Sequence, residues 1–177
     1  MEDREILNMK ILLPALVIIL FAVVLRLVPH PANVAPIAAM ALFGGLYLNK
    51  NYALVVPFLA MVVSDIFLGF HDTMIFVYGS FLLIGYIGLL VRNKKSVQTI
   101  FLASLAGSIL FFIVTNFGVW FMGNLYPKTF SGLMQSYMYA LPFFRNTLLG
   151  DLLYVGLFCG AYEIITKVVQ NKKLLWR

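Results

Sequence analysis

Residues 97–122 read VQTIFLASLAGSILFFIVTNFGVWFM, a run without a single charged side chain. A helix of about 20 apolar residues is long enough to cross the hydrocarbon core of a membrane. Similar apolar runs fill most of the chain, since 62% of its 177 residues are hydrophobic and only 11% are charged. No soluble domain of this length has a core large enough to bury so much apolar surface. The sequence therefore predicts one all-α integral membrane domain over residues 1–177.

Six transmembrane helices are expected, separated by prolines, glycines or charges. Pro29 ends the first helix, Asn33 is expected to cap the second, and the basic residues 92–95 follow the fourth. The segment 123–145 is interrupted by Pro142, among others, and is predicted to form a short lid helix at the membrane surface. The six expected spans are residues 10–28, 33–48, 52–70, 73–91, 97–122 and 146–169.

Small residues are frequent in the second expected helix, where Ala35, Ala39, Ala41 and Gly45 recur at four-residue spacings. Small side chains allow the backbone of a neighbouring helix to approach closely. We therefore expect another helix to pack tightly against this one.

The distribution of basic residues predicts how the chain is oriented, because cytoplasmic loops retain an excess of Lys and Arg. Of the 13 Lys and Arg residues, three fall on one side of the expected spans and the rest on the side of the N-terminus. The three are Arg26, Lys128 and Arg145; the others are Arg4, Lys10, Lys50, Arg92, Lys94, Lys95, Lys167, Lys172, Lys173 and Arg177. Both termini are therefore predicted to be cytoplasmic, which requires an even number of spans.

Ionisable residues within apolar spans are rare and ordinarily face protein or water. Arg26, Asp65 and Asp151 all fall toward the outer ends of their expected helices, with Arg145 nearby. Their similar depth suggests that the two aspartates pair with the two arginines. Such a cluster fits either a ligand pocket or a structural brace, and Arg26 alone could extend its side chain to the outer surface.

Other polar residues are also expected on the outer side. His30, Asn33, Asn116 and Asn146 are candidates for hydrogen bonds to a substrate. Each also has an ordinary alternative, because a loop histidine can simply face water and an asparagine can cap a helix. Nearer the inner end, Glu163 precedes Lys167 by four residues, the spacing of a helical ion pair.

Several functional classes receive no support from the residues. The chain has no catalytic triad order, no His-Glu-x-x-His zinc motif and no glycine-rich phosphate loop. Its single cysteine and two histidines supply no spaced metal site. Basic patches with interleaved aromatic residues, typical of nucleic-acid binding, are not found either. We therefore expect no enzymatic activity, no metal or other cofactor and no nucleic-acid partner.

Four segments resemble a bacterial family of uncharacterised proteins thought to act in transport. They are RLVPHPANVAPIAAMALFGG at 26–45, Ser64-Asp65 with GFH at 69–71, TNFGVW at 115–120, and NTLLGD at 146–151. The overall plan, with Gly150-Asp151 near the outer start of the last helix, is similar to the substrate-binding S-components of energy-coupling factor (ECF) vitamin transporters. On helix 1, where S-components usually carry their docking motif of small residues, this chain has Leu, Ile and Val.

The resemblance implies a multi-pass protein of the bacterial inner membrane, surrounded by membrane lipid, that captures a small vitamin-like substrate from outside. Uptake would then need a transmembrane coupling subunit and ATPases, with the small residues Ala35, Ala39, Ala41 and Gly45 as candidate docking surfaces. The candidate substrate-binding residues are Arg26, His30, Asn33, Asp65, Asn116, Arg145, Asn146 and Asp151. The alternative is a non-transporting scaffold or assembly subunit, in which the same residues only brace the bundle.

Overall fold

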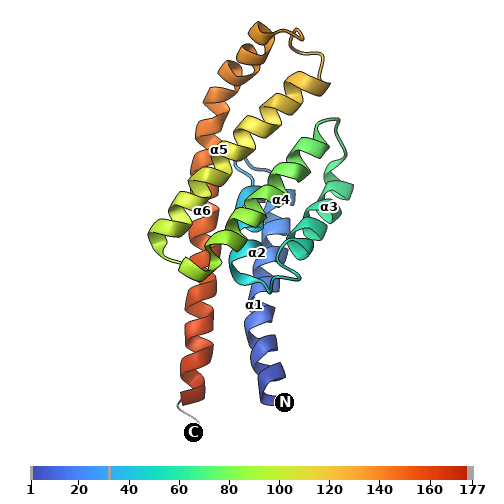
Figure 1. The fold of residues 1–177 in the computed structure, drawn as a ribbon. Coiled ribbons are helices and arrows are strands. Elements are labelled where there is room, and N and C mark those ends of the chain that lie inside the picture. Colours follow the sequence, from blue (N-terminus) through green and yellow to red (C-terminus); the bar gives the residue numbers. More distant parts are fainter. Residues whose placement is uncertain (1, 32, 175–177) are drawn as a thin grey trace.

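The computed structural model describes residues 2–31 and 33–174, with side chains described for 12–31 and 33–169. Within these ranges the chain forms helices and no strands. The helices are α1 (Glu2–Leu27), α2 (Ile37–Tyr47), α3 (Val55–Leu68), α4 (Met74–Val91), α5 (Val97–Met122) and α6 (Phe130–Leu174), with a 3-10 turn η1 (Arg92–Lys94). They run alternately up and down, so both described ends of the chain lie at the lower end of the bundle (Figure 1). The all-α prediction is confirmed.

Helix α2 forms the centre of the bundle and contacts the other five α-helices. Every residue from Ala38 to Tyr47 is buried. A helix that is apolar on all sides is typical of a protein core. The buried core combines residues of α2 with residues of the other helices, for example Phe81 of α4 and Phe158 of α6.

Glycines bring α2 and α4 into close contact. A Cβ atom on Gly45 would lie 2.1 Å from the carbonyl oxygen of Gly85, and one on Gly88 would lie 2.6 Å from that of Leu42. The expected tight packing of a helix against α2 is therefore confirmed, and its partner is α4. Because Ala39, Ala41 and Gly45 are buried inside this bundle, they do not form a free docking surface as the resemblance suggested.

Three stretches are long and apolar enough to cross a membrane, namely Met74–Lys94, Val97–Met122 and Phe130–Val169. The other apolar stretches among the described side chains are shorter, namely the part of α1 at Leu12–Leu27, and the helices Ile37–Tyr47 and Val55–Leu68. At a rise of about 1.5 Å per residue, α2 covers about 16 Å of a hydrocarbon core that is about 30 Å thick. Among the residues whose side chains are described, three helices are thus long and apolar enough to span a membrane, and the expected span 33–48 was too long.

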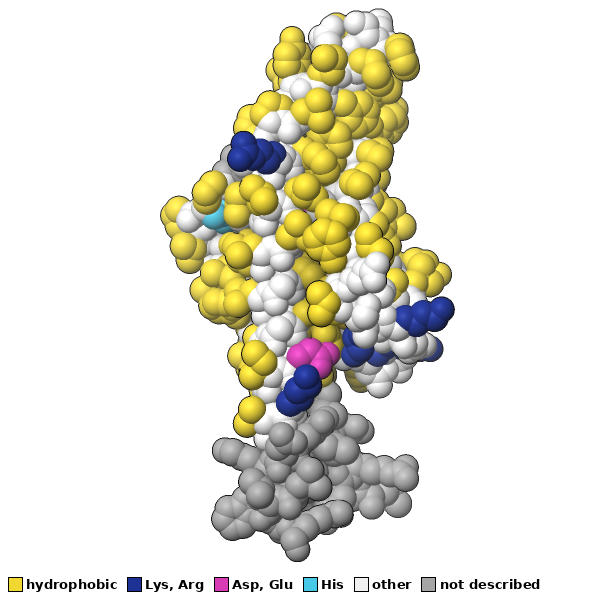
Figure 2. Space-filling view, turned by 90° about the vertical axis from the view of Figure 1, so that its left-hand side faces the viewer, with side chains coloured by type: hydrophobic (Ala, Val, Ile, Leu, Met, Phe, Trp, Pro, Cys, Tyr) yellow, Lys and Arg dark blue, Asp and Glu magenta, His cyan; other side chains and the backbone are white. Residues whose placement is uncertain are grey.

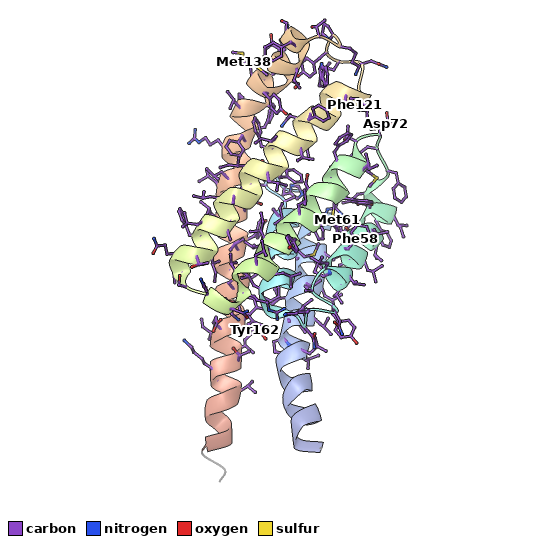
Figure 3. All side chains as sticks on the ribbon, viewed as in Figure 1. Phe58, Met61, Asp72, Phe121, Met138 and Tyr162 are labelled. Carbon is purple, nitrogen blue, oxygen red and sulfur yellow. The ribbon has the colours of Figure 1, made fainter. Side chains whose placement is uncertain are left out.

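The predicted separation of a lid at 123–145 from a last helix at 146–169 is wrong. Residues 130–145 of the predicted lid and the predicted last helix form the single helix α6, which passes through Pro142. Packing on α5 holds this part of the helix in place: the Tyr137 hydroxyl donates to the Ile113 carbonyl at 2.9 Å, and Phe112 contacts the rings of Tyr137 and Phe144. The α5–α6 hairpin, with Met138 near its tip, rises above the turn that carries Asp72 (Figure 3).

Only some of the basic residues that were predicted to face the cytoplasm lie among the described side chains. Lys50, Lys94 and Lys95 are exposed in the connections at the lower end of the bundle, and Lys167 is exposed on the lower part of α6. Arg92 is half-buried, and its Nη2 donates to the Leu48 carbonyl at 2.9 Å. The other five members lie outside the described side chains, namely Arg4, Lys10, Lys172, Lys173 and Arg177.

Candidate functional site

A buried ionic network joins α1, α3 and α4. The Arg26 side chain is 9% exposed and its Nη2 lies 2.5 Å from Oδ1 of Asp65, which is 2% exposed. Nη1 of Arg26 donates to Ser64 Oγ and to the Met61 carbonyl. On the other side of Asp65, the Tyr78 hydroxyl donates to Oδ2 at 2.8 Å. The expected pairing of Arg26 with Asp65 is confirmed, and Arg26 does not extend to the surface.

Asp151 has a different environment, because it lines a cavity. The residue is 3% exposed, and the Ser108 hydroxyl of α5 donates to its Oδ2 at 2.7 Å. The cavity, which we call the Asp151 pocket, has a volume of about 170 Å³. It is lined by His30, Asn33, Ala35, Ile37, Ala38, Phe111, Thr147 and Asp151. A buried carboxylate is thus placed at the edge of an open space.

The connection between α1 and α2 forms one wall of the Asp151 pocket. Asn33 has a positive φ of 62°, a conformation that asparagine tolerates better than most residues. Helix α2 begins only at Ile37, with Pro36 at its N-cap position and no side-chain capping bond. Asn33 therefore lines the pocket instead of capping α2 as predicted. A Cβ on Gly150 would lie 3.2 Å from Val34, so this glycine lets α6 approach the connection.

Arg145 does not pair with Asp151. Its side chain is exposed, and the ion pair found among the described side chains is the one between Arg26 and Asp65. The two residues are six positions apart on α6, and a helix of 3.6 residues per turn directs such a pair to different sides. The predicted cluster of two arginines and two aspartates is thus divided into a network and a separate pocket.

The remaining predicted site residues differ in their positions relative to the Asp151 pocket. His30 is exposed at the Asp151 pocket, where its Nδ1 lies 3.1 Å from the Pro31 carbonyl oxygen. Asn116 donates to the Phe112 carbonyl of its own helix at 2.8 Å and does not line the pocket. Asn146 is half-buried on α6 next to Thr147, which does line it.

Two polar residues near Asp151 were not among the predicted site residues: Thr147, which lines the Asp151 pocket, and Ser108, which donates to Asp151. Thr147 precedes Asp151 by four positions, so their shared face of α6 could have been recognised from the spacing. Ser108 had no such signal, because its contact with Asp151 depends on the rotation of α5 relative to α6. In the described part of the chain, no three His, Cys, Asp or Glu side chains gather as metal ligands.

No curated protein and no solved structure matches the chain. A model of a family of unknown function, DUF6580, matches residues 6–173, which is nearly the whole sequence. The chain therefore belongs to the family DUF6580.

Proposed function

We propose that the protein is a membrane transport protein that binds a small solute in the Asp151 pocket. The observation that carries this proposal is the buried carboxylate of Asp151 at the edge of a cavity, with Ser108 as its hydrogen-bond donor. A buried carboxylate normally requires an ion pair or several hydrogen bonds. A solute that donates hydrogen bonds, or carries a positive charge, would complete its coordination.

The size and lining of the pocket restrict the solute. About 170 Å³ is smaller than the 300–1,000 Å³ typical of drug-sized ligands, so the occupant is a small molecule or one polar group of a larger one. Asn33 and Thr147 offer further hydrogen-bonding groups, while Ile37 and Phe111 offer apolar contact. This lining suits a compact polar solute with one apolar side. A vitamin-like substrate is the class that the resemblance to ECF S-components implies.

The proposed setting is the bacterial inner membrane, with all six helices embedded and both termini in the cytoplasm. The apolar lengths of α4, α5 and α6 support embedding, and the exposed lysines at the lower end of the bundle support the orientation. The Asp151 pocket would then open toward the outer side. Coupling to a transmembrane subunit and ATPases, as in the ECF transporters, would supply the energy for uptake.

The alternative is a scaffold without transport activity. The buried ionic network around Arg26 favours such a structural role for the part of the molecule where α1, α3 and α4 meet. Arg26, Ser64, Asp65 and Tyr78 satisfy one another across three helices, and none of them lines the Asp151 pocket. We therefore assign these four residues a bracing role and restrict the solute-binding proposal to the Asp151 pocket.

The test is to identify small molecules that copurify with the protein by mass spectrometry, and then to measure their binding to variants. Asp151→Asn retains the size of the side chain and an acceptor for Ser108, but removes the charge. Binding should weaken at least about tenfold, because a hydrogen bond to a charged group contributes about 1.5 kcal/mol or more.

Glu163→Gln is the matched control, since Glu163 is a half-buried carboxylate on the same helix outside the pocket. It should leave binding unchanged. If no small molecule copurifies, or if both variants weaken binding equally, the Asp151 pocket is not the binding site and the scaffold alternative gains support.

A further inference from the structure

A second cavity lies at the lower end of the bundle, between the first turns of α5 and the part of α6 from Leu152 to Lys167. Its volume of about 620 Å³ exceeds that of the Asp151 pocket. We call it the Lys95 groove. Its lining combines a charged mouth, formed by Lys95, Glu163 and Lys167, with largely apolar walls.

The mouth of the Lys95 groove carries an excess of positive charge. Glu163 accepts a hydrogen bond from the Tyr47 hydroxyl at 3.0 Å, and Nζ of Lys95 lies 4.3 Å from the centre of the Tyr47 ring. In the described side chains neither Lys95 nor Lys167 forms an ion pair, so the predicted helical pair between Glu163 and Lys167 is not found. Two lysines beside one carboxylate attract an anion.

Ser104 supplies an independent indication that something binds in the groove. The residue lines the groove and is 3% exposed, yet its hydroxyl has no hydrogen-bond partner. The great majority of buried polar side chains are hydrogen-bonded, so an isolated one calls for an explanation. An occupant with an oxygen acceptor would provide the missing bond.

The walls of the groove leave room for an apolar chain. Ile100, Phe101 and Val155 form part of them, and Cβ atoms added to Gly156 or Gly160 would meet nothing within 4 Å. On the face in Figure 2, acidic and basic side chains gather near the lower end, and the surface above them is largely hydrophobic. Such a surface, charged at one end and apolar above, matches an amphiphile.

We propose that the Lys95 groove binds an anionic phospholipid of the cytoplasmic leaflet. Its phosphate lies between Lys95 and Lys167, an ester carbonyl accepts from Ser104, and an acyl chain follows the wall at Gly156 and Gly160. The ester carbonyls of a phospholipid lie deeper than its phosphate, as Ser104 lies deeper than Lys95 in the bundle. Basic pockets between helices on the cytoplasmic side are typical sites for anionic headgroups. The proposal depends on the orientation given above, but not on the Asp151 pocket.

A transmembrane helix of another protein is a less suitable occupant. Gly156 and Gly160 do have the GxxxG spacing that favours helix packing. A helix would cover them, but an ordinary apolar helix brings no anion to Lys95 and Lys167. The phosphodiester of a lipid provides both the charge and the apolar chain.

Native mass spectrometry of the delipidated full-length protein tests the proposal, with phosphatidylglycerol and phosphatidylcholine as probes. The protein should retain one phosphatidylglycerol in preference to phosphatidylcholine. The double variant Lys95→Gln/Lys167→Gln should bind phosphatidylglycerol about thirtyfold more weakly, since each lysine contributes about a fivefold factor. Lys50→Gln/Lys94→Gln is the matched control, because it removes two exposed lysines from the same end of the bundle.

Further experiments distinguish a phospholipid from the other possible occupants of the Lys95 groove. Gly156→Leu should fill the groove and lower lipid retention, whereas Gly79→Leu, at an equally open glycine of α4, should not. Glycerol phosphate alone should not compete with the lipid at equal concentration. The proposal is overturned if both lysine pairs have equal effects, if glycerol phosphate competes fully, or if Gly156→Leu disrupts only the association with a copurifying membrane protein. Because the readout is lipid retention, its failure would not affect the solute-binding test.

Discussion

Two buried aspartates of this chain have contrasting environments. Asp65 is enclosed by Arg26 and Tyr78, whereas Asp151 receives a hydrogen bond from Ser108 and borders a cavity. A carboxylate that is paired and hydrogen-bonded on both oxygens holds helices together. One that faces an open space can exchange partners with a ligand. Structural and binding roles are therefore expected to separate between these two residues.

Removing one partner of the Arg26–Asp65 pair should destabilise the protein strongly. Arg26→Ala leaves the Asp65 carboxylate buried without its cation, and breaking such a pair costs about 3–5 kcal/mol. The midpoint of thermal unfolding of the purified protein should fall, and the folded yield with it. The double variant Arg26→Met/Asp65→Leu should recover most of the loss, because no isolated charge remains. Equal losses in the single and double variants would mean that the cost does not come from an isolated buried charge.

Sequence predicted the depth of the ionisable residues but not the direction in which they point. Arg26 and Asp65 were expected at one level, and they meet there. Arg145 and Asp151 were also expected to meet, but their six-residue separation turns them to different sides of α6. Depth follows from position along an apolar run, whereas partners on other helices depend on rotations that no single sequence displays. Ser108 was missed for that reason.

Among the helices, α2 and α4 depend most directly on particular glycines. Gly45 and Gly88 lie where the two backbones meet, so neither position has space for a side chain. Contacts this close combine many small dispersion attractions, which are the main source of cohesion between helices in a membrane. The crossing of α2 and α4 is thus the structural centre of the bundle.

Gly45→Ala should destabilise the protein by about 1–3 kcal/mol or more, because even a Cβ would overlap the Gly85 carbonyl. Gly79→Ala is the control, since a Cβ there meets no atom within 4 Å and alanine favours helix by up to about 1 kcal/mol. Thermal unfolding of the two variants, followed by the loss of monodisperse protein on heating, should show opposite shifts. A neutral Gly45→Ala would mean that α2 and α4 can separate without cost.

Helix ends were predictable where a strong local signal marks them. The expected range 97–122 coincides with α5, which Ser96 caps by accepting from the Thr99 amide at 3.0 Å and which Gly123 ends. Pro142 was misleading because a proline removes only one helical hydrogen bond, and the packing of Tyr137 and Phe144 on α5 outweighs that loss. Tertiary packing of this kind cannot be read from local sequence.

For the whole molecule, the alternating helices place both described ends of the chain on one side (Figure 1). The exposed lysines of the connections lie at that end, and cytoplasmic loops are the ones that retain such residues. The geometry and the charge pattern are therefore consistent with the proposed orientation.

Labelling of single cysteines in intact cells tests that orientation. In a Cys159→Ala background, Asn124→Cys in the α5–α6 connection should react with a membrane-impermeant maleimide added from outside. Asn93→Cys, between α4 and α5, should react only after the membrane is permeabilised. Both positions are exposed, so accessibility within the protein does not distinguish them. Reversed labelling would place the Asp151 pocket on the cytoplasmic side and the Lys95 groove in the opposite leaflet.

The enclosure of α2 also affects the order in which the chain can be assembled. An eleven-residue helix cannot match the thickness of the bilayer, and nearly all of its surface is covered by protein. Lipid alone therefore gives it no stable position when it first leaves the ribosome. Its main partner, α4, is synthesised later, after α3. Biogenesis must keep α2 sheltered until α4 arrives, so a nascent chain that stops before residue 91 should be a substrate for membrane quality control.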